Sequence, residues 1–369
     1  MMPTTTRSLA ELTTMRVGGA PQGLVEVDSA DALVEAVRSV DDEGELLLVV
    51  GGGSNLVVAD EGFPGTVVLV RTRGVTVESA DACGGVVVRV AAGEPWDDLV
   101  ARAVGESWSG IEALAGIPGS TGATPVQNVG AYGQEVAQTI WSVRVYDRVT
   151  RAVRTLANAD CDFSYRHGLL KESMRLHEPE GRQVSPRYIV LEVSFQLRPT
   201  RLSQPVAYAD LARQLDVEPG SRVPLEEARQ AVLTQRSARG MVLDADDHDT
   251  WSCGSFFTNP ILSADDMAQV RERVRARLGA DGPSMPEWAA HDGTVKTSAA
   301  WLIDKAGYTK GYGLPGPAAL STKHSLAVTN RGSATASDVV ALARELRAGV
   351  DAAFGVCLVN EPVLVGHPL

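Results

Sequence analysis

Eighteen residues at positions 116–133, GIPGSTGATPVQNVGAYG, constrain the fold of this chain more than any other segment. They include five glycines and two prolines, a density at which neither a helix nor a strand is stable. A loop of this length inside a compact domain is usually functional. The segment therefore predicts a fold organised around a long binding loop.

A second glycine-rich segment, GGGSN at 51–55, directly follows the apolar run LLLVV at 46–50. Glycines lack a Cβ atom, so consecutive backbone N–H groups can converge on an anion. The segment is not a Walker A loop, because no Lys-Ser or Lys-Thr pair follows it. It also fails the GxGxxG pattern, because Leu56 stands where the last glycine belongs. Taken alone, the segment is equally compatible with a tight turn between strands.

Together the two segments predict a large dinucleotide held mostly by backbone groups, and FAD fits this description. Tyr132 would stack on the cofactor. The long loop also carries polar side chains that can donate to a pyrophosphate or to a ring edge: Ser120, Thr121, Gln127 and Asn128.

The composition excludes several other classes. With a net charge of −12 and no basic cluster, the chain is a poor partner for nucleic acid or for an anionic membrane. The start, MMPTTTRSLAELTT, has no apolar core of a secretory signal, and the apolar runs are too short to span a membrane. The four cysteines, at 83, 161, 253 and 357, have no metal-ligand spacing. We therefore expect a cytoplasmic monomer of two or three domains without a metal site.

Hydrophobic periodicity predicts an α+β chain. Asp28 and Ser29 would cap a helix whose apolar face includes Leu33. Strands are expected at 46–50, 66–70, 86–90, 141–146, 152–156 and 188–197. Further helices are expected near 96–104, after the capping pair Ser263 and Asp266, near 298–305 and near 337–354.

Three polar residues are candidates for chemistry, and each has a simpler explanation. Arg166, in the segment FSYR, is of a type usually exposed to solvent. Ser255 lies between Gly254 and two phenylalanines, where serine is normally a turn residue, and no GxSxG motif surrounds it. Glu361 stands in an expected short apolar C-terminal strand, where a carboxylate is costly to bury unless the strand is at an edge.

Seven segments, in order along the chain, resemble the motifs of the UDP-N-acetylenolpyruvoylglucosamine reductase family. They are TTMRVGG (13–19), GGGSN, the 116–133 loop, FSYR (163–166), GSFFTNP (254–260), AAWLID (299–304) and NEP (360–362). Each is weak alone, but together they cover nearly the whole chain. The resemblance implies an enzyme of peptidoglycan precursor synthesis that reduces UDP-N-acetylglucosamine enolpyruvate to UDP-N-acetylmuramate.

The resemblance also implies a fold and its division into domains. The fold would be α+β, with the two-lobed FAD-binding architecture of the vanillyl-alcohol-oxidase type and a third, substrate-binding α+β domain. The first lobe would comprise 1–75 and 356–369, the second 76–236, and the substrate-binding domain 237–355. FAD would be bound without a covalent link, and NADPH would be the hydride donor.

Catalytic roles follow from the matching positions. Hydride would pass from NADPH to FAD and then to C3 of the enolpyruvyl ether, and Ser255 would give a proton to C2. Arg166 would counter the charge of the carboxylate. Glu361 would act in protonated form or by orienting a donor. The residues expected to bind FAD are Gly51, Gly52, Gly53, Ser54, Asn55, Ile117, Gly119, Ser120, Gly122, Asn128, Gly130, Ala131, Tyr132 and Ile189.

Substrate contacts follow in the same way. Tyr208, in AYADL, matches the family's class with a tyrosine-bearing lid loop, and Asn259 and His324 would line the substrate pocket. Arg239 would lie near the diphosphate, although the family usually has lysine there, and an arginine fork contacts phosphate differently. The sequence also departs from the EPE pattern common near the family's C-terminus, because Asn360 precedes Glu361.

Two alternatives remain at the level of sequence. One is a flavin oxidase or dehydrogenase of the same fold with another substrate, which would favour a covalent flavin link. The other is a nucleotide-sugar-binding protein without catalysis, against which the joint presence of Arg166, Ser255 and Glu361 argues.

Overall fold

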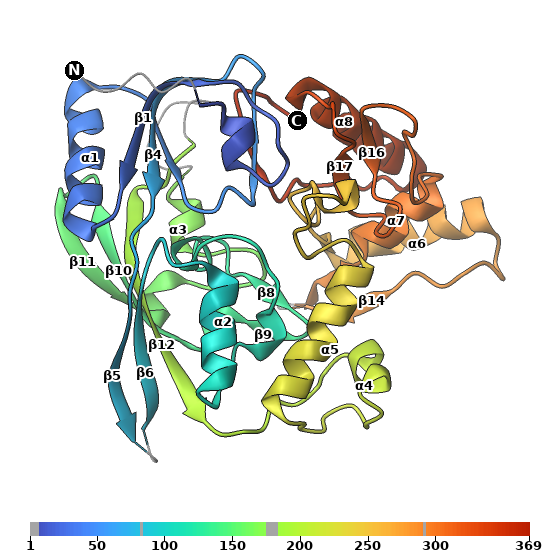
Figure 1. Ribbon diagram of the computed structural model, residues 1–369. Coiled ribbons are helices and arrows are strands. Elements are labelled where there is room, and N and C mark those ends of the chain that lie inside the picture. Colours follow the sequence, from blue (N-terminus) through green and yellow to red (C-terminus); the bar gives the residue numbers. More distant parts are fainter. Residues whose placement is uncertain (1–6, 82–83, 175–183, 291–292) are drawn as a thin grey trace. The chain divides into compact units, whose positions relative to one another are not determined.

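The computed structural model describes residues 7–81, 84–174, 184–290 and 293–369, so Cys83 lies outside the described residues. The chain divides into two compact units, and Figure 1 labels most of their helices and strands. Unit 1 comprises Met1–Ser8, Ala20–Gly53 and Gly62–Leu243. Unit 2 comprises Leu9–Gly19, Ser54–Glu61 and Asp244–Leu369.

Unit 1 contains a small parallel sheet. β1 (Pro21–Val27), β4 (Phe63–Val70) and β2 (Leu47–Val50) pair in this order, and α1 (Ala30–Glu43) connects β1 to β2. Ser29 accepts a hydrogen bond from the Ala32 N–H at 3.3 Å, and Gly44 ends the helix with a φ of 68°. The predicted helix and its cap are confirmed. GGGSN follows β2 directly, at the strand end where ligands of parallel sheets bind.

A larger antiparallel sheet completes the core of unit 1. Its order is β11 (Ala152–Ala157), β10 (Ile140–Asp147), β12 (Tyr188–Pro199), β6 (Gly85–Ala91) and β5 (Val75–Asp81), with β7 (Trp108–Ser109) also on β12. α2 (Trp96–Gly105) packs against it through Trp96, whose ring centroid is 5.8 Å from that of Phe195. Both rings are fully buried in a core that the two sheets share.

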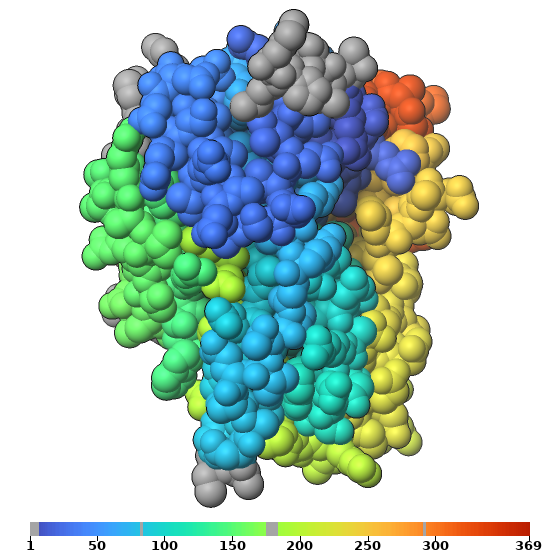
Figure 2. Space-filling view, turned by 60° about the vertical axis from the view of Figure 1, so that its left-hand side comes forward, coloured from blue at the N-terminus to red at the C-terminus, as the bar shows by residue number. Residues whose placement is uncertain are grey.

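Ion pairs fasten α1 to the hairpin of β10 and β11. Arg148 contacts Asp41 at 2.6 Å, and Arg151 pairs with Asp42. In the space-filling view, the blue surface of the α1 region accordingly borders the green surface of the hairpin (Figure 2). Unit 1 also contains α3 (Leu169–Glu172), α4 (Ala209–Gln214) and α5 (Leu225–Ala238), and a hairpin of β8 (Gly130–Ala131) and β9 (Gln134–Glu135).

Unit 2 is built from short sheets around three helices. β3 (Leu56–Val58) pairs in parallel with β18 (Val363–Val365), and β16 (Ala318–Leu320) pairs with β17 (Val328–Asn330). The third sheet has the order β13 (Ile261–Leu262), β15 (Val295–Thr297), β14 (Glu287–Ala289). The helices α6 (Ala264–Leu278), α7 (Ala299–Ala306) and α8 (Ala336–Phe354) share one core with Phe256 and Phe257.

The expected capping of α6 is confirmed, since the Ser263 hydroxyl accepts the Asp266 N–H at 3.1 Å. α5 was not predicted. Along the described parts of the chain, no helix combines the length and apolar character needed to cross a membrane.

Candidate functional site

The two glycine-rich segments meet in unit 1. A Cβ atom on Gly51 would lie 2.1 Å from the Ser120 hydroxyl, and one on Gly52 would lie 2.5 Å from the Gly119 Cα. The contact at Gly52 is with backbone, so this position requires glycine for the two segments to pack together, whereas at Gly51 the Ser120 hydroxyl would have to turn away. The long loop is also fixed to the larger sheet, because the Gly122 N–H donates to the Ala92 carbonyl at 2.8 Å.

The first segment leaves backbone donors open. Within the described residues, the N–H groups of Gly51, Gly52 and Gly53 donate to no protein acceptor. Gly53 has a φ of +64°, in the left-handed region. Unsatisfied N–H groups on a glycine turn at a strand end form an anion-binding nest. This geometry fits the pyrophosphate of a dinucleotide.

Arg71 is a residue that sequence reasoning missed. Its Nη1 donates to the Gly51 carbonyl at 3.2 Å, and burial lowers the pKa of its guanidinium. The signal was available, because Arg71 directly follows the strand β4 and so stands at the same sheet edge as GGGSN.

The side chain of Asn128 is bonded to residues outside the long loop. The side chain is buried; its Nδ2 donates to Glu135 Oε2 at 2.8 Å and to the Ser164 carbonyl at 3.0 Å. Its Oδ1 accepts the Ala137 N–H at 3.2 Å. The amide that we expected to reach a ring edge is therefore engaged within the protein, and only backbone atoms of Asn128 remain for a cofactor.

Arg166 lies against the long loop. It occupies a tight turn closed by Ser164 and His167, with a φ of +54°. Its Nη1 donates to the Asn128 carbonyl at 3.3 Å and its Nη2 to the Gly130 carbonyl at 2.9 Å. A left-handed non-glycine residue is uncommon and marks functional positions more often than chance. The structure thus places Arg166 beside the predicted cofactor loop.

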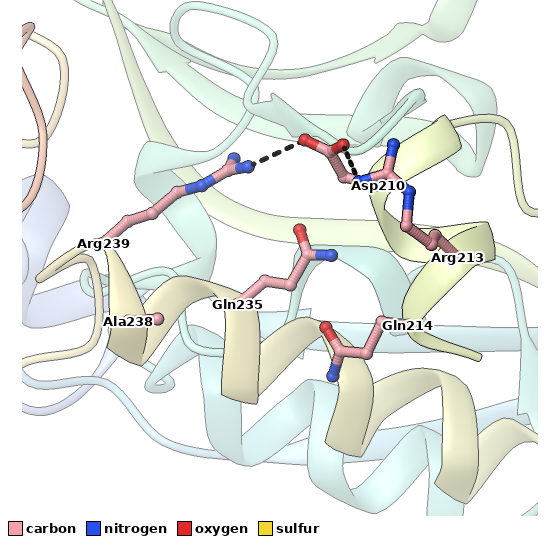
Figure 3. Close-up of a pocket in the computed structure, with 6 residues that line it drawn as sticks. All are labelled: Asp210, Arg213, Gln214, Gln235, Ala238 and Arg239. Atoms are coloured by element: carbon pink, nitrogen blue, oxygen red, sulfur yellow. Dashed lines mark hydrogen bonds and ion pairs between the residues drawn. The ribbon is translucent and has the colours of Figure 1, made fainter. Parts of the chain in front are cut away.

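Tyr208 and Arg239 come together on the surface of unit 1. Tyr208 precedes α4, is 53% exposed, and meets Tyr132 edge-on with ring centroids 6.0 Å apart. Arg239, after α5, reaches Asp210 at 3.4 Å, and Asp210 also contacts Arg213 at 3.3 Å (Figure 3). A shallow depression of about 530 Å³ is lined by Asp210, Arg213, Gln214, Gln235, Ala238 and Arg239.

Ser255 and Glu361 are brought together in unit 2 by crossing segments. The Glu361 N–H donates to the Phe256 carbonyl at 2.8 Å, so Glu361 lies opposite the residue that follows Ser255. The Phe256 N–H donates to the Leu326 carbonyl at 2.8 Å, and the Leu326 N–H donates to His324 Nδ1 at 3.2 Å. The backbone therefore gathers Ser255, Glu361 and His324, which stand far apart in sequence. Because Nδ1 accepts a hydrogen bond, the neutral His324 carries its proton on Nε2.

The expected position of Glu361 needs a correction. We predicted it inside the last strand, but β18 begins at Val363, and Glu361 precedes it in an irregular segment. Proline at 362 cannot donate to a strand ladder, which explains the later start. Asn55 holds this segment, because its Nδ2 donates to the Glu361 carbonyl at 3.3 Å. The end of GGGSN thus belongs to unit 2 and its three glycines to unit 1.

The other predicted residues differ in exposure. The Oδ1 of Asn259 accepts a hydrogen bond from the Ala299 N–H, in the first turn of α7, at 3.0 Å. Among the predicted FAD contacts, Gly53, Ser120, Gly122, Asn128 and Ile189 are buried, and Gly51, Gly52, Ser54, Asn55, Ile117, Gly119, Gly130, Ala131 and Tyr132 keep exposed surface. No group of acidic, histidine or cysteine residues in the described ranges is arranged to hold a metal.

Known proteins match the chain along almost its entire length. It is 56% identical over 362 residues to UDP-N-acetylenolpyruvoylglucosamine reductase of Streptomyces avermitilis, which covers 98% of this chain and 94% of the relative. It is 53% identical over 361 residues to the enzyme of that name from Thermobifida fusca, covering 98% and 97%. This chain belongs to the UDP-N-acetylenolpyruvoylglucosamine reductase family.

Domain models agree with this membership. The model of the C-terminal domain of UDP-N-acetylenolpyruvoylglucosamine reductase matches residues 246–365, and a model of an FAD-binding domain matches 21–155. The second range contains both glycine-rich segments. The prediction from those segments that the cofactor is FAD is therefore confirmed.

The fold prediction is confirmed as well. The crystal structure of UDP-N-acetylenolpyruvylglucosamine reductase from Thermus caldophilus matches 99% of this chain and 100% of its own, with a TM-score of 0.62 and 24% identity. The reductase-family fold thus extends over both units. The three domain boundaries expected from the sequence stay a prediction.

Proposed function

We propose that this chain reduces UDP-N-acetylglucosamine enolpyruvate to UDP-N-acetylmuramate with NADPH as the reductant. The names of its relatives support this activity, since the similarity covers almost the whole chain. The single structural observation that carries the proposal is the hydrogen bond from the Glu361 N–H to the Phe256 carbonyl at 2.8 Å. It places Glu361 opposite the residue that follows Ser255, and the proposed chemistry assigns roles to Glu361 and Ser255.

FAD would be held by the open N–H groups of Gly51–Gly53 and by the long loop that packs on them. When bound, it supplies the hydride that C3 of the enolpyruvyl group receives. Ser255 then donates the proton of its hydroxyl to C2, so the double bond gains one hydride and one proton. A neutral hydroxyl suits this step because no charge is buried before the transfer and the carbon it protonates is strongly basic; the alkoxide left on Ser255 takes a proton from solvent before the next turnover.

Arg166 would counter the negative charge that spreads into the substrate carboxylate. Its turn and its two bonds to loop carbonyls fix the guanidinium before substrate arrives, which is the condition for electrostatic catalysis. Glu361 would act on the same charge in protonated form or by orienting a donor. Tyr208 and Arg239 would contact the sugar nucleotide, Tyr208 as part of a lid.

An anaerobic titration tests the proposal. NADPH added to the purified yellow protein should bleach the flavin absorbance, and UDP-N-acetylglucosamine enolpyruvate should then restore it. A flavin that NADPH reduces but the enolpyruvyl compound does not reoxidise would overturn the proposed substrate. Absorbance that stays with the denatured chain would instead support an oxidase with covalently linked flavin.

A further inference from the structure

Two arginines one helical turn apart, at the end of α5, have opposite surroundings. Arg239 is partly exposed and pairs with Asp210 (Figure 3). Arg236 forms no ion pair with any described residue, since no carboxylate oxygen lies within 4.0 Å of its guanidinium. Its Nη2 donates to the Met241 carbonyl at 2.8 Å, whereas its Nε is buried and has no partner among the described residues.

Arg236 lies against the start of the long glycine loop. A Cβ on Gly116 would be 3.5 Å from its Nε. The charge of Arg236 also acts on Tyr132, at the other end of the loop, where it opposes the effect of burial on the pKa of the phenol. The guanidinium therefore stands close to both ends of the segment that carries the predicted FAD contacts.

The protein itself does little to balance this charge. Asp97 attracts it from beyond ion-pair distance, but that carboxylate already accepts the Gly116 N–H at 2.6 Å and Arg229 Nη2 at 3.2 Å. The negative end of α5 offsets only part of a full charge. Burial consequently lowers the pKa of Arg236 to about 10. The residue as a whole is partly buried, but its charge has no ion-pair partner among the described residues, and such a charge destabilises a fold until an anion arrives.

We propose that Arg236 is the counter-ion for a diphosphate oxyanion of a bound ligand. The inference rests on the proposed function, in which FAD and the UDP-sugar both carry a diphosphate. An arginine fork is the side chain best suited to such an oxyanion. FAD and the UDP-sugar share the diphosphate group, and the binding of FAD and that of UDP can each be measured alone.

Arg236→Gln separates this role from a structural one. In the full-length chain stripped of FAD, the variant should unfold at the same or a higher temperature than the unchanged protein, because a partly buried charge without an ion-pair partner among the described residues is gone. The rise in unfolding temperature on adding FAD or UDP should shrink, and the affinity for at least one of them should fall by at least tenfold. Arg236→Lys, which keeps the charge without the fork, should recover part of that loss.

Arg271→Gln is the control, since Arg271 is exposed, lies in α6 of unit 2 and already pairs with Glu287. It should change neither affinity more than twofold. If FAD affinity alone falls in Arg236→Gln, the partner is the cofactor diphosphate; if UDP affinity alone falls, it is that of the sugar nucleotide.

A lower unfolding temperature of the FAD-free variant, with both affinities unchanged, would overturn the inference. It would make Arg236 a cap for the turn at Met241. Failure of the proposed function is distinguishable, because it would show in the unchanged protein as binding of FAD and UDP without reoxidation by the enolpyruvyl compound.

Discussion

The ligand-facing parts of the two units are made from different atoms. In unit 1, residues 51–53 and 116–133 meet through backbone, and a Cβ on Gly51 or Gly52 would clash with the other segment. In unit 2, Ser255 and Glu361 are held by backbone bonds around Phe256 and offer their side chains for chemistry. We therefore expect unit 1 to be sensitive to added atoms and unit 2 to lost functional groups.

Ser255→Ala tests the unit 2 side of this comparison and should have the largest effect. Removing the proton donor should slow flavin reoxidation by the enolpyruvyl substrate by roughly 10³-fold, the range of general acid catalysis. Reduction of the flavin by NADPH should persist, because that half-reaction needs no proton at C2. Anaerobic stopped-flow absorbance measures the two half-reactions separately.

Cys253→Ala is its control, since Cys253 is the nearest other acid in the segment. Burial raises the pKa of that thiol to about 12, so reoxidation should stay almost unchanged. Equal slowing of both half-reactions in Ser255→Ala would make the serine structural.

Asp147→Asn tests whether the backbone site of unit 1 depends on the stability of the sheet that carries it. Asp147 is fully buried in unit 1 and accepts both Arg187 Nε and Nη2 at 2.7 Å. Breaking one partner of such a pair should cost about 3 kcal/mol of unfolding free energy. Thermal release of FAD, followed by flavin fluorescence, should come at a lower temperature than in Asp249→Asn, which removes the buried partner of Arg331 in unit 2.

The same carboxylate predicts a pH dependence. Hydrogen bonds from Arg187 hold the pKa of Asp147 well below its usual range. Its stabilisation is therefore complete above the unfolded pKa of about 3.9 and is lost as the pH falls below that value. Denaturant titrations between pH 5 and pH 2, on the order of one unit apart, should show a flatter loss for Asp147→Asn. An unchanged slope would assign acid unfolding to other carboxylates.

Helices and strands with a strong hydrophobic periodicity were predicted from the sequence. Those whose buried face differs little in hydrophobicity from the exposed face were not. α1 was predicted from its cap and from the spacing of Leu33 and Val40. α5 was not, because its buried face consists largely of small residues, Ala228 and Ala231 beside Leu225 and Val232. The meeting of the two glycine segments depends on long-range packing, which composition alone does not encode.

The site shows the same division. Glycine-rich segments and the order of motifs predicted which residues are candidates, Ser255 and Arg166 among them, and the roles of these residues stay predictions. The bonds of the Asn128 side chain to Glu135 and Ser164, and the lack of a partner for Arg236 Nε among the described residues, follow only from three-dimensional neighbours. Single residues do not reveal such partners, because each side chain can satisfy its hydrogen bonds in several ways.

Gly52→Ala tests the unit 1 side with one added atom. The new methyl group would lie 2.5 Å from the Gly119 Cα, so backbone of the long loop must move. We expect FAD affinity to fall about tenfold and the free energy of unfolding by about 1–3 kcal/mol, the usual range for overpacking. Gly105→Ala is the control, because nothing lies within 4 Å of a Cβ there and the residue ends α2. Unchanged FAD affinity in Gly52→Ala would show that the two glycine segments can move apart to fit a methyl group. FAD binding by unit 1 would then not be sensitive to added atoms.

Thiol reactivity is the mildest test, because it compares the packing around side chains without altering the site. Burial raises the pKa of Cys161 in unit 1 to about 11 and that of Cys253 in unit 2 to about 12, whereas Cys357 is exposed. In a Cys83→Ser background, an aromatic disulfide reagent at pH 8 should therefore modify one thiol quickly, since thiolates are the reactive form. Cys357→Ser should abolish the fast phase. A second fast thiol that disappears in Cys253→Ala would mean that the segment around Ser255 opens readily, and side chains in unit 2 would then be less firmly placed than the backbone of unit 1.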